Sequence, residues 1–205
     1  MTTDFDSKAR TWDTTEKAER AQSVADGIGG KLKMTRDMTG FEYGCGTGLL
    51  SFCLRDQLGH ITLADNSAGM LEVVAEKIQA AGITDMTPVQ LDLMKEAAPE
   101  TPFQLIYTML TLHHIDDTNG IVGIFYAMLS EGGYLCIADL DKEDGSFHRG
   151  EFDGHHGFDQ QQLKEKLERA GFTDVAFEIC YDIKKEVDGG GTRSFPVFLM
   201  TCVKK

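Results

Sequence analysis

The feature that most constrains the fold is a regular alternation of short apolar runs and helical segments along the chain. The apolar runs have the length of buried strands, and most segments between them have the length and periodicity of helices. Strands connected through helices run parallel, so the alternation predicts a parallel sheet covered by helices on both faces. We expect strands ending at Tyr43 and over 60–64, 88–91, 103–108 and 134–139, with helices over 47–58, 68–81, 120–130 and 159–170.

Both ends of the chain depart from this alternation. Residues 14–28 have the charge spacing of a peripheral helix, which the glycines at 27, 29 and 30 are expected to stop. Near the other end, strand-like runs over 175–181 and 196–203 have no helix between them, which predicts an antiparallel hairpin with 188–191 as its loop. We find no linker or repeat and expect a single domain over 1–205, with a helical cap over 1–38 and a core over 39–205.

Charge and composition exclude several classes of partner. The 33 acidic and 20 basic residues give a net charge of −13, which would repel a phosphate backbone, so nucleic acid is not an expected partner. There is no apolar run of about 18 residues and no signal-peptide core, so we expect a cytoplasmic protein without a membrane span. The five cysteines lack C-x-x-C spacing and are expected to be buried free thiols.

The first strand candidate runs into a turn with three glycines at alternate positions. In the stretch from Glu42 to Gly48, these glycines allow the backbone to turn sharply and let a ligand approach the peptide groups at the next helix. A purely structural strand-to-helix turn is the alternative. The third glycine of the dinucleotide pattern would fall at Leu49, so a nicotinamide cofactor is less favoured.

Two carboxylates follow this turn at the ends of the next strands. Asp65 ends the second strand, where it can accept hydrogen bonds from both hydroxyls of a ribose. Asp92 follows the third strand, at the same carboxyl edge of the sheet where open α/β folds bind ligands. For each aspartate alone, a helix cap or an exposed loop position is an equal alternative.

Together these motifs resemble the class I S-adenosylmethionine-dependent methyltransferases, over the chain from about residue 39 to its end. The resemblance implies a Rossmann-like α/β fold with a seven-stranded, mostly parallel sheet in the order 3-2-1-4-5-7-6, strand 7 being antiparallel. It also implies S-adenosylmethionine as the cofactor. The implied cofactor-binding residues are Glu42, Gly44, Cys45, Gly46, Thr47 and Gly48 for the methionine part, Asp65 for the ribose, Asn66, Ser67, Met70, Asp92 and Leu93 for the adenine, and Thr108 and Met109 beside the methionine group.

More narrowly, the chain is similar to the ubiquinone and menaquinone biosynthesis methyltransferases, which act on small molecules. Residues 9–13 are similar to the segment that folds over the cofactor in such relatives. Gln104 departs from the aspartate of many relatives without disturbing the cofactor assignment. The Asn/Asp-Pro-Pro-Tyr/Phe segment that marks methylation of nucleic-acid or glutamine amino groups is missing after the fourth strand.

Five histidines follow the fourth and fifth strands and are the candidate catalytic residues, although a structural role is the alternative for each. The polar segment over 141–158 is expected to cover the active site. A metal site at Asp153, His155 and His156 lacks any zinc spacing, so no metal is predicted. The five candidates are His113, His114, His148, His155 and His156.

The sequence therefore predicts in-line transfer of a methyl group from S-adenosylmethionine to a small-molecule acceptor. A general base is needed only for a hydroxyl or a protonated amine acceptor. The alternatives are a catalytically silent cofactor-binding scaffold and an NAD-dependent oxidoreductase.

Overall fold

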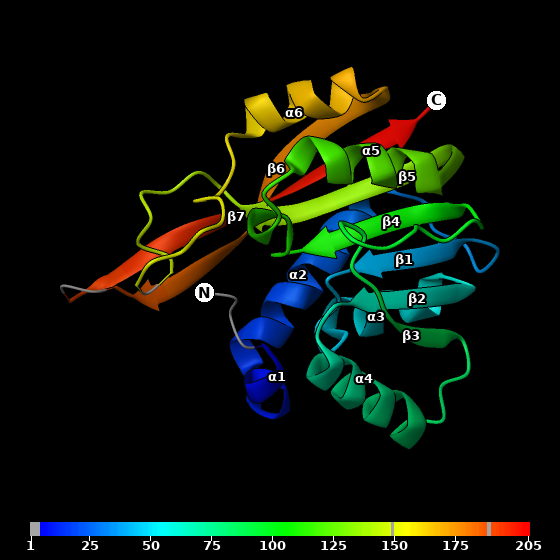
Figure 1. Ribbon diagram of the computed structural model, residues 1–205, viewed down its shortest axis with the longest axis horizontal. Coiled ribbons are helices and arrows are strands. Elements are labelled where there is room, and N and C mark those ends of the chain that lie inside the picture. The colour runs from blue at the N-terminus through cyan, green and yellow to red at the C-terminus, as the bar shows by residue number, and fades with distance from the viewer. Residues whose placement is uncertain (1–4, 149, 188–189) are drawn as a thin grey trace.

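The computed structural model describes residues 5–148, 150–187 and 190–205. Seven strands form one sheet in the order β3-β2-β1-β4-β5-β7-β6, in which β7 runs antiparallel to both of its neighbours (Figure 1). This arrangement confirms the predicted fold and strand order. The strands are β1 (Thr39–Tyr43), β2 (His60–Asp65), β3 (Met86–Gln90), β4 (Phe103–Met109), β5 (Leu129–Leu140), β6 (Phe172–Glu186) and β7 (Thr192–Lys204).

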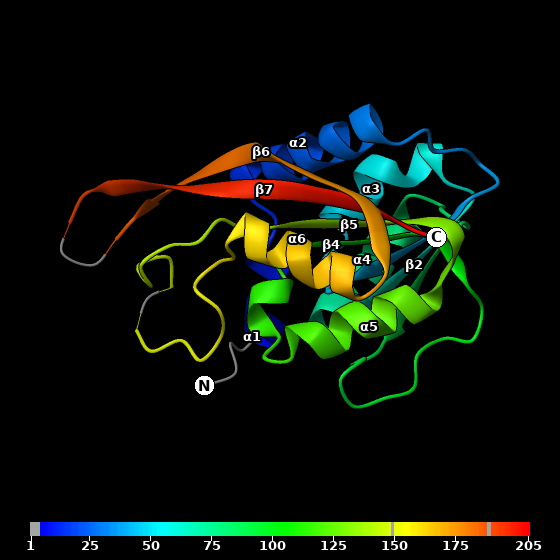
Figure 2. The same ribbon diagram turned by 90° about the horizontal axis from the view of Figure 1, so that it is seen from above.

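Helices cover both faces of the sheet, which Figure 2 shows from above. One core cluster joins the sheet to α2 (Thr15–Lys31), α3 (Leu49–Leu54) and α4 (Ala68–Ala80). The opposite cluster joins it to α5 (Thr118–Met128) and α6 (Gln160–Arg169). Side chains of a strand alternate between these clusters, as Leu105 and Ile106 of β4 do. The short segments are α1 (Phe5–Lys8) and the 3-10 turns η1 (Ala9–Thr11), η2 (Arg55–Gln57) and η3 (Leu112–His114).

The expected end of the N-terminal helix was wrong. Helix α2 continues through Gly27, Gly29 and Gly30 to Lys31. At Gly27 an added Cβ would lie 2.8 Å from a methyl of Leu199 on β7, so this glycine allows the helix to pack closely on the sheet. Packing of the apolar face of α2 outweighs the helix-breaking tendency of glycine, which costs only about 1 kcal/mol per residue.

The C-terminal hairpin is confirmed, and its strands are longer than predicted. Strand β7 pairs with β5 only from Val197 to Val203, whereas β6 and β7 pair with each other as far as Glu186 and Thr192. The distal part of the hairpin therefore projects beyond the sheet (Figure 1). Of the predicted hairpin loop, Asp188 and Gly189 lie outside the described residues.

The order of the strands creates a switch point at the centre of the sheet. Strand β1 is flanked by β2 on one side and by β4 on the other, and all three are parallel. In open α/β sheets, ligands bind at such a point, outside the carboxyl ends of the strands. Within the described part of the chain, no helix is long and apolar enough to cross a membrane.

Candidate functional site

The glycine turn between β1 and α3 lies at this switch point. Gly44, Gly46 and Gly48 all have positive φ angles, of 69°, 53° and 80°. An added Cβ at Gly44 would lie 2.3 Å from the side chain of Thr111, which follows β4, so the turn packs directly against the neighbouring strand end. At Gly46 the nearest atom to an added Cβ is 3.7 Å away, on Trp12. This distance is an ordinary van der Waals contact, so Trp12 of the N-terminal segment covers Gly46.

Asp65 lies at the end of β2 and holds the turn in place. Its Oδ2 accepts a hydrogen bond of 2.7 Å from the amide of Gly46, and its Oδ1 accepts one of 2.9 Å from the amide of Ser67. Burial raises the pKa of this carboxyl group. Each carboxylate oxygen can accept two hydrogen bonds, so Asp65 keeps acceptor capacity for a ligand.

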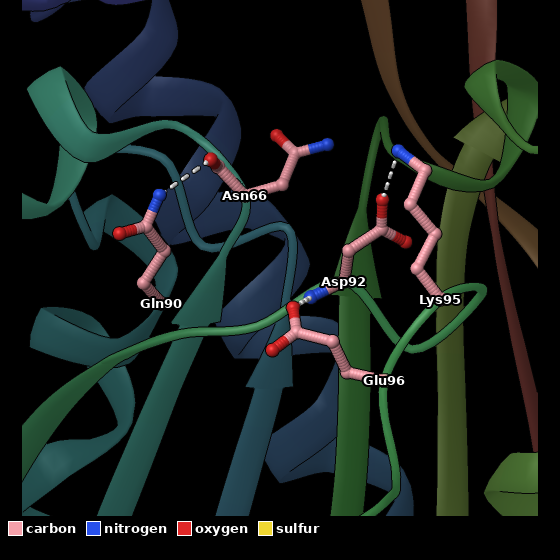
Figure 3. A pocket seen from close by; sticks show the side chains of 5 residues that line it. All are labelled: Asn66, Gln90, Asp92, Lys95 and Glu96. Carbon is pink, nitrogen blue, oxygen red and sulfur yellow. Dashed lines mark hydrogen bonds and ion pairs between the residues drawn. The ribbon is translucent and has the colours of Figure 1, made fainter.

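Asp92 borders a hollow of about 430 Å³ beside the end of β3. Figure 3 shows Asn66, Gln90, Lys95 and Glu96 around it. The carboxylate of Asp92 forms an ion pair of 2.8 Å with Lys95 and accepts a hydrogen bond from the amide of Met94. The hollow has a polar lining, and its volume lies within the range of small-molecule pockets.

Several predicted cofactor residues lie inside the protein and hold the site together. Leu93 is buried, and its amide donates to the hydroxyl of Tyr43 at 3.1 Å. Cys45 and Met70 are buried, and Ser67 caps helix α4 by accepting from the amide of Met70.

Glu42 lies beneath the turn and is 1% exposed. Its carboxyl group accepts hydrogen bonds from the amide and the hydroxyl of Ser51 on α3, and that hydroxyl is 2.6 Å from the hydroxyl of Tyr107. Burial raises the pKa of Glu42 to about 8. Ser51 thus connects Glu42 on β1 with Tyr107 on β4 through hydrogen bonds.

The N-terminal segment lies across the glycine turn and the start of α4. The carboxylate of Asp6 accepts hydrogen bonds from the hydroxyl of Ser67 and the amide of Gly69. Asp13 bonds to the hydroxyl of Thr47, and Lys77 bonds to both Asp13 and the carbonyl of Thr47. Sequence reasoning missed Asp6 and Lys77, since only the fold brings α1 and α4 together, whereas Asp13 lies in the segment over 9–13 that was expected to cover the cofactor.

The opposite side of the turn is formed by the end of β4. Thr108 is buried, and among the described residues its hydroxyl has no hydrogen-bond partner. The carbonyls of Met109 and Gly44 both accept from the hydroxyl of Thr111, at 3.2 and 3.3 Å. Gln104, at the other end of β4, accepts from the amide and hydroxyl of Thr39 and is therefore remote from the turn.

Three of the five candidate histidines lie together beyond the end of β4. The rings of His113, His114 and His148 have centroids 4.2 to 5.7 Å apart. Burial lowers the pKa of His114 to about 4 and that of His148 to about 3. The Nδ1 atom of His113 is 2.6 Å from the carboxylate of Asp139, which is fully buried at the end of β5. Sequence reasoning missed Asp139, although its place at a strand end, like that of Asp65, could have drawn attention to it.

His155 and His156 make their polar contacts with residues outside this cluster. The Nε2 atom of His155 is 3.0 Å from the carbonyl of Ile115 and 3.2 Å from the hydroxyl of Thr118, which fits a role in holding the loop to α5. His156 is half exposed and lies 3.5 Å from Glu143.

The comparisons with known proteins agree with this geometry. A family described as methyltransferase domain matches residues 18–176, which is well over half of the chain. The chain belongs to this family of S-adenosylmethionine-dependent methyltransferases. Membership in it agrees with the family resemblance and the cofactor predicted from the sequence.

The individual relatives have low sequence identity to this chain, as two of them show. Phosphoethanolamine N-methyltransferase 1 of Arabidopsis thaliana is 26% identical over 170 residues, covering 77% of this chain and 34% of the relative. The ubiquinone biosynthesis O-methyltransferase of Xylella fastidiosa is 31% identical over 108 residues, covering 52% of this chain and 43% of the relative. The chain therefore spans 34% of the length of the first relative and 43% of the length of the second.

A solved structure has the same fold over nearly the whole length of both chains. It is a Haloferax volcanii methyltransferase in complex with the Trm112 methyltransferase activator, with a TM-score of 0.76 and 18% identity. The match covers 99% of this chain and 98% of that one.

Proposed function

We propose that this methyltransferase transfers the methyl group of S-adenosylmethionine to a small-molecule acceptor. The observation that carries the proposal is the glycine turn at the switch point of the sheet, held by the Asp65 carboxylate, together with a hollow lined by Asn66 and Asp92, which follow β2 and β3. A glycine turn, with one carboxylate at the end of β2 and another just after β3, fits a ligand with an amino-acid part, a ribose and a base.

The cofactor-binding residues proposed here are those expected from the sequence. The turn from Gly44 to Gly48, with Thr108 and Met109, would hold the methionine part. Asp65 would accept from the ribose hydroxyls while retaining its bonds to the turn. Asn66, Ser67, Met70, Asp92 and Leu93 would surround the adenine. Glu42, whose carboxyl group bonds to Ser51, would act by supporting the turn from below.

The chain's own part in the reaction is alignment and exclusion of water. When bound, S-adenosylmethionine supplies an electrophilic methyl group on a positively charged sulfur. The N-terminal segment, with Trp12 over Gly46, would cover the cofactor. The segment over 141–158, which carries His148, would cover the acceptor.

The acceptor is proposed to bind against the histidine cluster, across the turn from Asp65. Phe5 of the N-terminal segment makes an edge contact with both Trp12 and His114, and so lies between the cofactor side and the histidine side. The net charge of −13 disfavours nucleic acid as the acceptor. The acceptors named for the two relatives, phosphoethanolamine and a ubiquinone precursor, are small molecules. A cytoplasmic location stays a prediction from the sequence.

Calorimetry with S-adenosylhomocysteine tests the cofactor site. We expect Asp65→Ala to weaken binding about ten- to hundredfold, because hydrogen bonds to a charged group contribute about 1.5–3 kcal/mol. Asp56→Ala is the matched control, since Asp56 is exposed on η2. No binding by the unaltered protein, or equal affinity for both variants, would contradict the proposal.

Transfer of a labelled methyl group to a panel of phenols, amines, phosphobases and thiols tests the reaction. A product formed only with S-adenosylmethionine supports it. Tight cofactor binding without any product would favour the silent scaffold, and NADH binding in place of S-adenosylhomocysteine would favour the oxidoreductase.

A further inference from the structure

The ring nitrogens of the histidine cluster lie close together in a way that methyl transfer alone does not require. His113, His114 and His148 each offer one ring nitrogen, and these nitrogens all lie within 4.8 Å of one another. His113 and His114 belong to η3, whereas His148 comes from the segment over 141–158. Among the described residues this is the one group of three or more histidines, cysteines and carboxylates close enough to hold a metal ion.

The most buried of the three rings is held in the orientation of a metal ligand. Asp139 is 0% exposed and His113 is 2% exposed, and the carboxylate accepts from the Nδ1 atom of His113 at 2.6 Å. The amides of His113 and Leu140 also donate to this carboxylate, which fixes its position. When Nδ1 donates to a carboxylate, the Nε2 lone pair is free to bind a cation, and most metal-binding histidines are held in this way.

His148 supplies a second, independent sign of a missing ligand. Its Nδ1 atom is buried and has no hydrogen-bond partner among the described residues. The ring is stacked on Phe152 at 3.6 Å between centroids and makes an edge contact with Phe147. An unsatisfied buried imidazole nitrogen costs about 1–3 kcal/mol, and coordination to a cation would remove that cost.

We propose that His113, His114 and His148 bind one divalent transition-metal ion, Zn²⁺ or a metal of similar ligand preference, with Asp139 orienting His113. Three imidazoles suit zinc, nickel, copper or iron, whereas magnesium and calcium require oxygen ligands. Zinc bonds to histidine nitrogen are about 2.1 Å long, so tetrahedral ligands lie about 3.4 Å apart. The rings must therefore close inward, and His148 lies in a segment outside the helices and strands.

Such a site has the composition of an open metal centre. Three protein ligands leave one position for water or substrate. His114 and His148 are partly exposed, whereas His113 is buried, so the ion can enter from the surface. If the proposed function holds, the open position faces the acceptor and would bind an acceptor with an oxygen, nitrogen or sulfur lone pair. In the sequence a metal was considered only at Asp153, His155 and His156, and none was predicted; the sequence gives no sign of this site because His148 stands 34 positions after His114.

Metal binding is measured on the full chain, purified without a histidine tag and treated with EDTA. Titration with Co²⁺ is followed by its visible d–d absorption, and Zn²⁺ binding is followed by calorimetry and by displacement of Co²⁺. We expect one ion per chain and a loss of affinity of at least tenfold in His148→Ala. Asp139→Asn should weaken binding about ten- to hundredfold, as removal of such a supporting group does elsewhere.

His60→Ala is the matched control. His60 begins β2 beside Thr87, at the amino ends of the parallel strands, whereas the histidine cluster lies beyond their carboxyl ends. It should bind metal as the unaltered protein does. Absence of a visible Co²⁺ spectrum, or equal affinity in His148→Ala and His60→Ala, would overturn the proposal. Because no cofactor is present in these measurements, their result is independent of the S-adenosylhomocysteine titration.

Discussion

The buried carboxyl group of Glu42 predicts a pH dependence of stability that a single substitution should remove. An acid whose pKa is near 4.5 when unfolded and about 8 when folded keeps its proton in the folded state while the unfolded chain releases it. Stability therefore falls as pH rises from 4.5 to 8 and then levels off. Gln is isosteric with the neutral acid and can accept the same hydrogen bonds from Ser51.

The size of the effect follows from linkage. Between pH 5 and pH 8 the unaltered protein should lose about 3–4 kcal/mol relative to Glu42→Gln. For a chain of this length, that difference corresponds to about 10 °C in melting temperature. Thermal and urea unfolding of both proteins at several pH values between 5 and 9 measure it.

Glu100→Gln is the control, because Glu100 is exposed and its substitution should leave the pH profile unchanged. If the Glu42→Gln profile runs parallel to that of the unaltered protein, the carboxyl group is ionised in the folded state. The account of Glu42 as a neutral hydrogen-bonded group beneath the turn would then be wrong.

Two further predictions concern the turn and the segment over it. Gly48→Ala should destabilise the fold by about 1–3 kcal/mol in urea unfolding, because a Cβ would lie 2.7 Å from a valine methyl on α4 at a φ of +80°. Gly82→Ala, with a φ of +63° and open space, should cost less, and an equal loss would refute the packing argument. Asp6→Asn should speed trypsin cleavage after Lys8, since Asp6 fastens the segment to α4; a rate equal to that of Asp56→Asn would show that it does not.

The sequence predicted the parallel part of the sheet well because most of its strands are short apolar runs connected through helices, and local patterns record both. It failed at Gly27, where contact with β7 outweighs local helix propensity. The glycine turn and Asp65 were predictable because they lie within one strand–turn–helix–strand unit. The contacts of Asp139, Asp6 and Lys77 depend on which distant elements the fold brings together, and spacing along the chain carries no such information.

The projecting part of the hairpin bonds to the segment that carries His148. Arg193 of β7 bonds at 2.7 Å to Asp144, and Lys185 of β6 bonds to the carbonyl of Phe147, next to His148. Both bonds come from the part of the hairpin that projects beyond the sheet, where β6 and β7 pair with each other and β7 no longer pairs with β5 (Figure 1). The position of His148 therefore depends on the hairpin as well as on its own segment, so a substitution at Arg193 or Lys185 acts on the histidine cluster without touching it.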